Sequence, residues 1–374
     1  MAELIGARAR WFPMAVVALV AAAVAAGPSS AQSAQSSAVP SVTQSAPRGF
    51  FGVVPTDLQA DDYQLIQQAN FGTARLPIEW NTIESAEGKF DWGPMDRRIG
   101  GFASRGIAVL PVLFGTPSWL ANDHAIPPVG SDRLQGAWER FVGQAVRRYG
   151  EGGAYWSTDY RLQFPGAQPK PITTWQIWNE QNGPKHFLPR PNVKKYATLL
   201  GIANRAVEAE NPGGQILTGG LASKPTGSGG ISAWKFVKKL TKKKSARNSF
   251  DHVGLHPYAR DDREIVSHVK KMRKALKKGR KKKAQLWITE VGWSSVPNAA
   301  APKLSTTPEG QAERLTKTYS RLLKKRGPWK IGGVYWYTWR DFGGGVCNWC
   351  PNAGLVTSNL QPKPAFNAYT QIAG

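Results

Sequence analysis

The chain has 374 residues, and its 49 Lys and Arg residues outnumber its 25 Asp and Glu residues, which gives a net charge of +24 at pH 7. A protein of that charge binds nucleic acid nonspecifically in vitro, but the sequence carries no recognition motif, which excludes a sequence-specific reader of DNA or RNA. Only two cysteines occur, so no second Cys pair is present to complete a four-thiolate zinc site.

Residues 1–31 have the pattern of a secretory signal peptide. Two arginines precede an apolar run at positions 11–26, and small residues follow, with cleavage expected after Ala26 or Ala31. The run is short and alanine-rich for a membrane span, and an uncleaved anchor is the alternative interpretation. Residues 32–47 are rich in Ser, Ala, Gln and Pro with almost no charge, which predicts a flexible linker.

Residues 48–374 are expected to form one domain, because strand-like and helix-like segments alternate throughout them. Eight strand-like segments, rich in β-branched, aromatic and other apolar residues, occur at positions 50–55, 73–80, 107–114, 172–178, 215–219, 252–256, 285–289 and 333–339. Eight strand–helix units imply a parallel sheet closed into a (β/α)8 TIM barrel of the α/β class. An open doubly wound sheet is the alternative, but it would want a glycine-rich phosphate loop after an early strand, and residues 53–58 contain no glycine.

The clearest helical segment is 134–149. Its apolar residues form one stripe, made of Leu134, Ala137, Trp138, Phe141, Val142, Ala145, Val146 and Tyr149. A second helix is expected to begin at Thr307-Pro308-Glu309, where proline occupies the first turn.

Two of the strand-like segments run into a glutamate, Glu180 and Glu290. A carboxylate at the end of a buried strand lies half in the protein and half in a cleft, and we expect this environment to raise its pKa toward the range of a general acid. The alternative for Glu180 is a place in the first turn of the next helix, where acidic residues interact favourably with the dipole. Cleavage of a glycosidic bond needs two carboxyls, one to protonate the leaving oxygen and one to attack or stabilise the sugar cation.

The residues around these glutamates resemble a known group of enzymes. Residues 178–180 (Trp-Asn-Glu) and 289–293 (Thr-Glu-Val-Gly-Trp) are similar to the two catalytic strands of retaining glycoside hydrolases of the (β/α)8 clan, clan A, especially the β-xylosidase-like and cellulase-like members of families 39 and 5. The resemblance extends over almost all of the chain after the linker. It implies that Glu180 is the acid/base, that Glu290 is the nucleophile, and that Asn179 binds the sugar 2-hydroxyl, with a turn asparagine as the alternative.

Three further polar residues near strand ends are candidates for the site. Arg75 is expected to keep the nucleophile ionised through a charge-assisted hydrogen bond, and an ion pair with Glu79 or another carboxylate is the alternative. The resemblance implies that Tyr258 bonds the nucleophile and that His256 lines the same subsite. A satisfied core histidine is the alternative for His256.

Three tryptophans are candidate walls of a sugar site, because sugar rings present apolar C–H faces that stack on indoles. Trp339 is expected to be the platform under the reacting sugar, with Trp293 and Trp119 as further walls. Packing in the core is the alternative for all three.

Two loops are expected to influence substrate choice, as polar loops at the carboxyl ends of barrel strands usually do. In residues 181–193, Gln181 stands where many relatives have proline, a difference expected to alter loop shape rather than chemistry. The other loop, residues 343–351, contains three glycines and a Cys-x-x-Cys pair. In an oxidising compartment Cys347 and Cys350 are expected to form a local disulfide, and a redox or metal role is the alternative.

Much of the positive charge gathers in residues 235–244 and 270–283. Apolar residues at helical spacing accompany the lysines of the second segment, which predicts an outer helix with its lysines in solvent, away from the active end of the barrel. The simple interpretation is a solvated basic surface. The functional one is attachment to an anionic polymer such as a cell-wall polyanion or an acidic polysaccharide.

These features predict a secreted, monomeric, retaining glycoside hydrolase that acts on a β-linked glycan without metal or organic cofactor. A non-catalytic carbohydrate-binding or wall-binding protein on the same barrel is one alternative, and a transglycosylase is another. Because both glutamates are intact, the sequence argues against the binding-only alternative.

Overall fold

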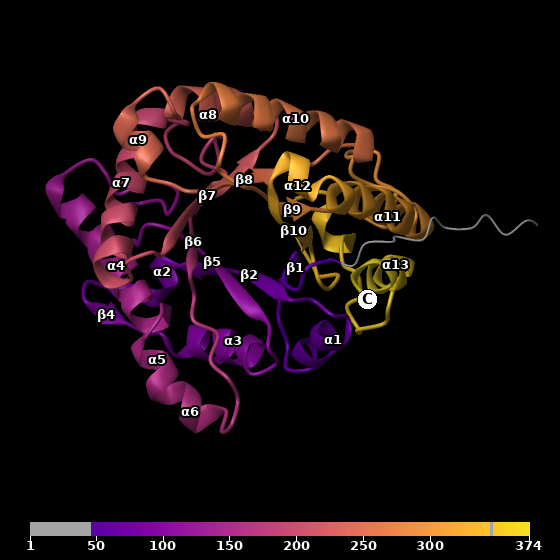
Figure 1. Cartoon of the computed structure of the whole chain (residues 1–374), viewed down its shortest axis with the longest axis horizontal. Coiled ribbons are helices and arrows are strands. Elements are labelled where there is room, and N and C mark those ends of the chain that lie inside the picture. The colour runs from indigo at the N-terminus through magenta and orange to yellow at the C-terminus, as the bar shows by residue number, and fades with distance from the viewer. Residues whose placement is uncertain (1–45, 345–346) are drawn as a thin grey trace, which may run out of the picture. The chain divides into compact units, whose positions relative to one another are not determined.

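A computed structural model describes residues 46–344 and 347–374 of the chain. Eight parallel strands close into a barrel in the order β1-β10-β9-β8-β7-β6-β5-β2 (Figure 1). They are β1 Phe51–Val54, β2 Thr73–Glu79, β5 Ala108–Phe114, β6 Thr174–Asn179, β7 Gln215–Ala222, β8 Val253–His256, β9 Leu286–Val291 and β10 Ile331–Tyr337. Each overlaps one predicted segment, so the (β/α)8 barrel is confirmed. The remaining strands, β3 (Glu84–Ala86) and β4 (Lys89–Phe90), form a separate antiparallel hairpin.

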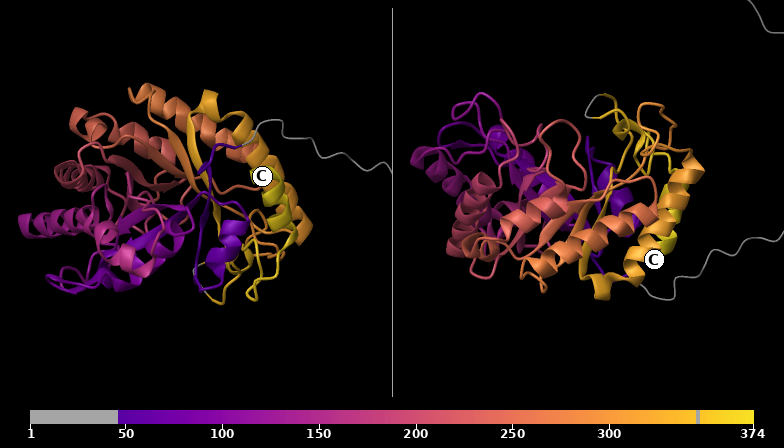
Figure 2. Two further views of the ribbon diagram at one scale, coloured as in Figure 1. Left: turned by 60° about the horizontal axis from the view of Figure 1, so that its bottom comes forward. Right: turned by 90° about the horizontal axis from the view of Figure 1, so that it is seen from above.

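Helices connect the strands and surround the barrel (Figures 1 and 2). They are α1 Asp62–Gln68, α2 Trp80–Ile83, α3 Gly93–Ala103, α4 Asp132–Tyr149, α5 Ala154–Ser157, α6 Asp159–Gln163, α7 Val193–Glu210, α8 Ala233–Leu240, α9 Lys244–Asn248, α10 Asp262–Lys278, α11 Pro308–Lys324, α12 Arg326–Trp329, α13 Pro364–Ala373 and the 3-10 helix η1 Cys350–Asn352. Within the described ranges, none of these helices combines the length and apolar character that crossing a bilayer requires. The predicted signal peptide and nearly all of the predicted linker lie outside the described residues.

Local sequence signals account for the starts of the two helices that were predicted most clearly. The side chain of Ser131 accepts a hydrogen bond from the backbone N–H of Leu134 at the start of α4. Helix α11 begins at Pro308, and the side chain of Thr307 caps the N–H of Gly310. The expected apolar stripe of α4 is buried, apart from the partly exposed Leu134.

The apolar core has two layers, one inside the barrel and one between the barrel and the helices. Val54, Leu110, Leu217 and Tyr335 form a small cluster of their own. They come from β1, β5, β7 and β10, which are not all neighbours, so they meet across the barrel interior. A much larger cluster packs the outward faces of the strands against the helices. The interior is therefore filled by side chains, and substrate has access only to an end of the barrel.

A buried carboxylate ties helix α1 to the segment after β10. Asp62 is fully buried, and its Oδ1 accepts from the indole N–H of Trp339 at 2.7 Å and lies 2.9 Å from Nη2 of Arg340. Its Oδ2 accepts from the backbone N–H of Gln59 at 2.6 Å. Because α1 follows β1 and Arg340 follows β10, this network supports the place where the first and last strands close the barrel.

Replacing Asp62 with alanine is expected to lower the free energy of unfolding by about 3–5 kcal/mol, because the nearly buried Arg340 would lose its counter-charge. Denaturant titration of the parent and the variant measures the difference. The matched control is Glu208→Ala on the exposed face of α7, which should change stability by less than about 0.5 kcal/mol. Equal losses in both variants would contradict the assigned role of Asp62.

Candidate active site

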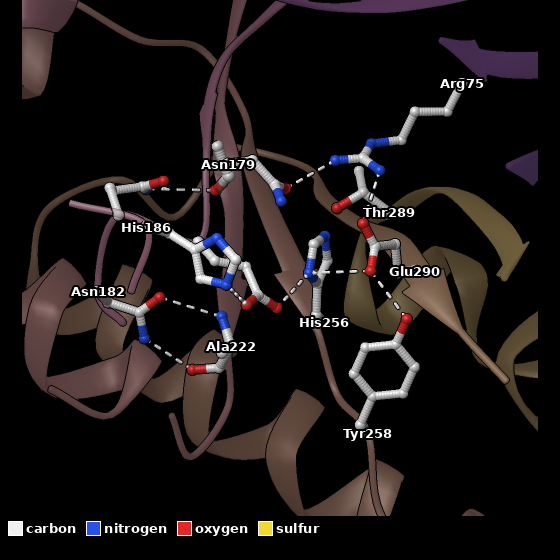
Figure 3. Close-up of polar contacts among 12 residues, drawn as sticks. Arg75, Asn179, Asn182, His186, Ala222, His256, Tyr258, Thr289 and Glu290 are labelled. Carbon is white, nitrogen blue, oxygen red and sulfur yellow. Dashed lines mark hydrogen bonds and ion pairs between the residues drawn. The ribbon is translucent and has the colours of Figure 1, made fainter. Parts of the chain in front are cut away.

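Arg75 is the third residue of β2, and its guanidinium bonds to three other side chains. It is 5% exposed, and its Nη1 donates to Oε1 of Glu290 at 2.7 Å. Its Nη2 donates to Oδ1 of Asn179 at 2.9 Å (Figure 3). Its Nε donates to Oε1 of Gln176 at 2.7 Å. The guanidinium therefore links β2 to β6 and β9, and its charge is balanced by Glu290 rather than by Glu79.

Glu290, on β9, is held by a partner at each carboxylate oxygen. Besides Arg75 at Oε1, the hydroxyl of Tyr258 donates to Oε2 at 2.8 Å, and Nδ1 of His256 lies 3.4 Å from the same oxygen (Figure 3). Burial and the charge of Glu290 raise the pKa of Tyr258 well above its ordinary value, so this hydroxyl stays protonated and remains a donor. The Glu290 side chain is only 12% exposed, and its position is defined from both sides.

Glu180 is the first residue after β6, and both of its carboxylate oxygens face histidines. Oε1 lies 2.9 Å from Nδ1 of His256, and Oε2 lies 3.2 Å from Nε2 of His186. One carboxylate oxygen of Glu180, one of Glu290 and one ring nitrogen of His256 all lie within 4.8 Å of one another. Two strand ends that are far apart in the sequence thus bring two carboxylates to one place.

The pKa of Glu180 departs from the expectation. Burial raises it, but the hydrogen bond and charge of His256, with the charges of His186 and Arg75, outweigh burial and leave the pKa of Glu180 below its ordinary value. The sequence predicts a raised pKa because it shows only that Glu180 follows a buried strand. It does not show that histidines gather around this carboxylate. In the free protein, Glu180 is therefore held ionised.

A local break in strand β6 brings Asn179 and Glu180 to the site. Side chains alternate along a strand, so Gln176 and Asn179, three residues apart, would normally face opposite sides, yet both bond to Arg75. Trp178, between them, has a φ of 69°, and Glu180 has a φ of 45°. Such left-handed conformations cost non-glycine residues about 1–3 kcal/mol and cluster at functional sites. The indole of Trp178 compensates by packing on Trp138 and donating to the carbonyl of His186 at 2.7 Å.

His256, at the end of β8, is fully buried between the two glutamates. Its Nε2 has no hydrogen-bond partner among the described residues, whereas Nδ1 faces both carboxylates, so Nδ1 is the ring nitrogen that donates to them. The ring packs against Gly220 of β7, where an added Cβ would lie 1.9 Å from Nε2. The close approach of the imidazole therefore requires glycine at position 220.

Two of the three tryptophans proposed as sugar walls are buried, which contradicts that prediction. Trp339 is 0% exposed, and its indole is bonded to Asp62. Trp293 is also 0% exposed and donates to the carbonyl of Ala259 at 2.7 Å. Both rings pack in the large core cluster and present no face to a ligand. Trp119 is only partly buried and stays a candidate.

The predicted disulfide between Cys347 and Cys350 is present, and its loop supports the site. Trp349, between the two cysteines, is 7% exposed and packs edge-on against the ring of Tyr258 with centroids 5.0 Å apart. The loop thus helps to position the tyrosine that donates to Glu290. Residues 345–346 of this loop lie outside the described part of the chain.

Sequence reasoning missed several supporting residues. Gln176 accepts from the guanidinium of Arg75, and His186, in the loop of residues 181–193, contacts the Glu180 carboxylate. Gln181 is fully buried, and its amide donates to the carbonyl of Gly219 at 3.3 Å. Asn182 ties the loop after β6 to the last residue of β7 through the backbone N–H and C=O of Ala222 (Figure 3). None of these contacts has a sequence signal, because each depends on two elements meeting in space.

The same cluster has the residue types of a metal site, but its hydrogen bonds fit a metal ion poorly. Glu180, His256 and Glu290 are the one set of metal-ligating residue types in the described ranges that is compact enough to bind a cation together. However, both oxygens of Glu290 already accept from Arg75 and Tyr258, and the positive guanidinium lies beside them. This chemistry fits a hydrogen-bonded carboxylate pair better than a ligand set for a divalent ion.

Comparison with known proteins finds a shared fold. No protein-family model and no curated protein sequence matches this chain. Among solved structures, a family 39 glycoside hydrolase from the gut symbiont Bacteroides cellulosilyticus WH2 matches with 22% identity and a TM-score of 0.64, covering 87% of this chain and 63% of that chain. This chain thus spans somewhat less than two thirds of the length of that enzyme.

Two further solved structures are similar to this chain. A monomeric β-xylosidase from Caulobacter crescentus CB15 has 15% identity and a TM-score of 0.62, with coverage of 86% of this chain and 67% of that chain. The GH5_18 protein of Streptomyces cattleya, in complex with GlcNAc, has 15% identity and a TM-score of 0.61, with coverage of 88% and 80%. The chain therefore has the barrel fold found in these clan A glycoside hydrolases.

The packing of His256 on Gly220 leads to a prediction about stability. Gly220→Ala places a methyl group where the imidazole lies and should lower the free energy of unfolding by about 1–3 kcal/mol while displacing His256. Denaturant titration measures the first effect, and the NMR signals of the His256 ring report the second.

Gly136→Ala is the matched control for this substitution. Gly136 lies within helix α4, and no atom is within 4 Å of the place that an added Cβ would take, so alanine there should stabilise by up to about 1 kcal/mol. A Gly220→Ala variant as stable as the parent, with unshifted His256 signals, would show that the contact is not tight.

Proposed function

We propose that this protein is a secreted, retaining glycoside hydrolase that cleaves β-linked O-glycosidic bonds by double displacement. Glu180 is the acid/base in this proposal, and Glu290 is the nucleophile. The observation that carries it is the carboxylate pair at the ends of β6 and β9, with oxygens within 4.8 Å of each other. Carboxyl groups of retaining enzymes stand about 5–5.5 Å apart, whereas inverting enzymes leave roughly 6.5–9.5 Å for a water molecule.

The contacts of Glu290 suit a nucleophile. Arg75 and Tyr258 donate to its two oxygens, which favours the carboxylate form and fixes its direction. The Glu290 carboxylate attacks the anomeric carbon and forms a bond to it. The glycosidic bond breaks as Glu180 gives its proton to the leaving oxygen. Water then enters, Glu180 takes a proton from it, and the bond between the sugar and Glu290 breaks, which retains the anomeric configuration.

Asn179 is proposed to bind the sugar 2-hydroxyl. Its Oδ1 accepts from Arg75, so the amide nitrogen is the end of the side chain left for substrate. A bond to this hydroxyl that strengthens in the transition state contributes to catalysis rather than to binding alone. His256 and Tyr258 border the same subsite, and the partly exposed Trp119 is proposed as a wall further out.

The substrate and the location of the protein are also proposals. A β-linked glycan is supported by similar structures that are named as a β-xylosidase, a β-galactosidase and an exo-β-1,4-mannosidase. Secretion is supported by the signal-like residues 1–31 and by the paired cysteines, since disulfides persist in oxidising compartments. We further propose that the enzyme acts as a monomer.

The basic outer helices support a second role, attachment to an anionic cell-wall polymer. Residues 235–283 hold 19 of the 49 Lys and Arg residues but only four of the 25 Asp and Glu residues. Helices α8 and α10 pack side by side there (Figure 1). Their apolar faces are buried and their lysines are exposed. Most of these lysines lie in the carboxyl-terminal parts of the helices, after which the chain leads to the amino-terminal ends of β8, by way of α9, and of β9. A polymer bound there would leave the active end open.

The two glutamates are tested with a panel of aryl β-glycosides and β-glycans. Glu290→Ala is expected to lower activity about a thousandfold or more, because no nucleophile remains. Glu180→Ala should lose activity mainly on unactivated leaving groups, and added azide should restore turnover by forming a glycosyl azide of retained configuration. Product analysis by NMR identifies the anomer.

Glu208→Gln is the control, since this exposed glutamate lies on α7, outside the barrel. The activity of this variant should match that of the parent. A parent that binds a glycan but releases no sugar, with all variants equally silent, would favour the non-catalytic alternative. Products longer than the substrate would instead indicate transglycosylation.

Attachment to an anionic polymer is tested by charge reversal on α10. Replacing Lys271, Lys274 and Lys278 together with glutamate should abolish retention on immobilised polygalacturonate at low salt, because the contact is electrostatic. The control reverses three exposed charges elsewhere, Lys89, Arg161 and Lys194. Equal loss of retention in both triple variants would show that net charge alone, and not the α8–α10 surface, is responsible.

A further inference from the structure

The two histidines that face Glu180 differ in their freedom to move. His256 is 0% exposed and packs on Gly220, so its ring holds Oε1 in a fixed place. The His186 side chain is 47% exposed, and its ring holds Oε2 from the solvent side. Glu180 itself is only 20% exposed. The outer oxygen, Oε2, is therefore covered by a ring that can move away. The inner oxygen, Oε1, is held by a ring that cannot.

The backbone of His186 is anchored although its side chain is exposed. Its carbonyl accepts from the indole of Trp178 at 2.7 Å, and its N–H donates to the carbonyl of Gly183 at 3.3 Å. The neighbouring Phe187 is fully buried against Trp178. Side-chain rotation alone can thus move the imidazole away from Glu180 without unfolding the loop. Exposed rotamers exchange within nanoseconds, so this motion would not limit turnover.

An acid/base must present one oxygen to the leaving group, and here both oxygens have partners. Because His256 is fixed, Oε2 is the oxygen that can turn to a substrate, and His186 occupies the place next to it. We propose that His186 is a displaceable clamp on the acid/base: it covers Oε2 of Glu180 in the free enzyme and is pushed aside by the leaving-group sugar. His186 is then a positioning residue, and its place marks the leaving-group subsite. This inference rests on the proposed acid/base role of Glu180.

Displacement of the clamp has a consequence for the protonation of Glu180. The charge of His186 lowers the pKa of this carboxyl in the free enzyme, and its departure removes that effect just when the substrate excludes water. Both changes favour the protonated form that the first step needs. The other titratable groups around Glu180 are His256 on β8, Arg75 on β2, Glu290 on β9, and the tyrosines Tyr258 and Tyr337. These stay in place when His186 moves.

The test uses pH profiles of His186→Ala and His186→Gln on a glycoside with an unactivated leaving group. The profile of kcat/KM reports the free enzyme, and that of kcat reports the substrate complex. Because His186 lowers the pKa of Glu180, its removal should move the basic limb of kcat/KM to higher pH, by roughly 0.5–1 unit for His186→Ala. His186→Gln keeps a hydrogen-bond donor and should shift less. The basic limb of kcat should not move, because the clamp is already displaced.

Three outcomes would overturn the clamp. Equal shifts of both limbs would show that His186 stays on Glu180 during turnover. A uniform drop at all pH values with unmoved limbs would show a merely structural role. The third comes from titration of the Glu180 carboxyl by NMR without substrate, where an unchanged pKa in His186→Ala would show that the ring does not hold this carboxylate.

The NMR titration also separates this inference from the proposed function. A parent without glycosidase activity would end the acid/base proposal, while the contact between His186 and Glu180 would still be decided by the titration. His124→Gln is the matched control, since His124 is another exposed histidine beside a carboxylate, 3.8 Å from Asp123. It should leave both limbs and the Glu180 pKa where the parent has them.

Discussion

The buried guanidinium of Arg75 is the interaction on which the rest of the site depends. A cation with 5% exposure is costly unless it is paired and hydrogen-bonded. Glu290 supplies the charge, while Gln176 and Asn179 supply neutral acceptors from β6. The acceptors come from β6 and β9, and both strands must be in register with β2 to reach the guanidinium. The closed barrel and the cluster therefore stabilise each other, and removal of Glu290 would leave a buried cation unbalanced.

The two carboxylates have different surroundings, which suits different work. Glu290 accepts from a cation and from a tyrosine whose pKa is raised, so its ionised form is favoured and its direction is fixed. Glu180 faces one buried histidine and one exposed histidine, so one of its two contacts can be lost by rotation of a side chain. Both partners of Glu180 depend on backbone features of their own, a close glycine under His256 and the left-handed Trp178 beside the loop of His186. The strain in β6 is compensated by the packing of that indole.

Chemistry and net charge are separated along the barrel axis. The glutamates, Arg75 and the histidines gather at the carboxyl ends of the strands, where loops can approach a ligand. The lysines of α8 and α10 lie on outer helix faces and toward the other end. Because helices run back antiparallel to the strands, charge placed late in a helix is carried away from the active end. A basic surface can therefore coexist with a site whose own electrostatics are set by a few buried groups.

The sequence by itself determined the eight strands, the apolar stripe of α4, the start of α11, the disulfide and the two strand ends that carry glutamate. These are encoded in local periodicity, helix-start signals and residue type. It did not determine the burial of Trp339 and Trp293, the lowered pKa of Glu180, or the support from Gln176, His186 and Trp349. Exposure and pKa depend on which elements meet, and a residue such as His186 acts only through the group that folding brings beside it. Strand alternation alone would even have turned Asn179 away from Arg75. Only the tertiary structure, through the left-handed turn at Trp178, decided that it faces inward.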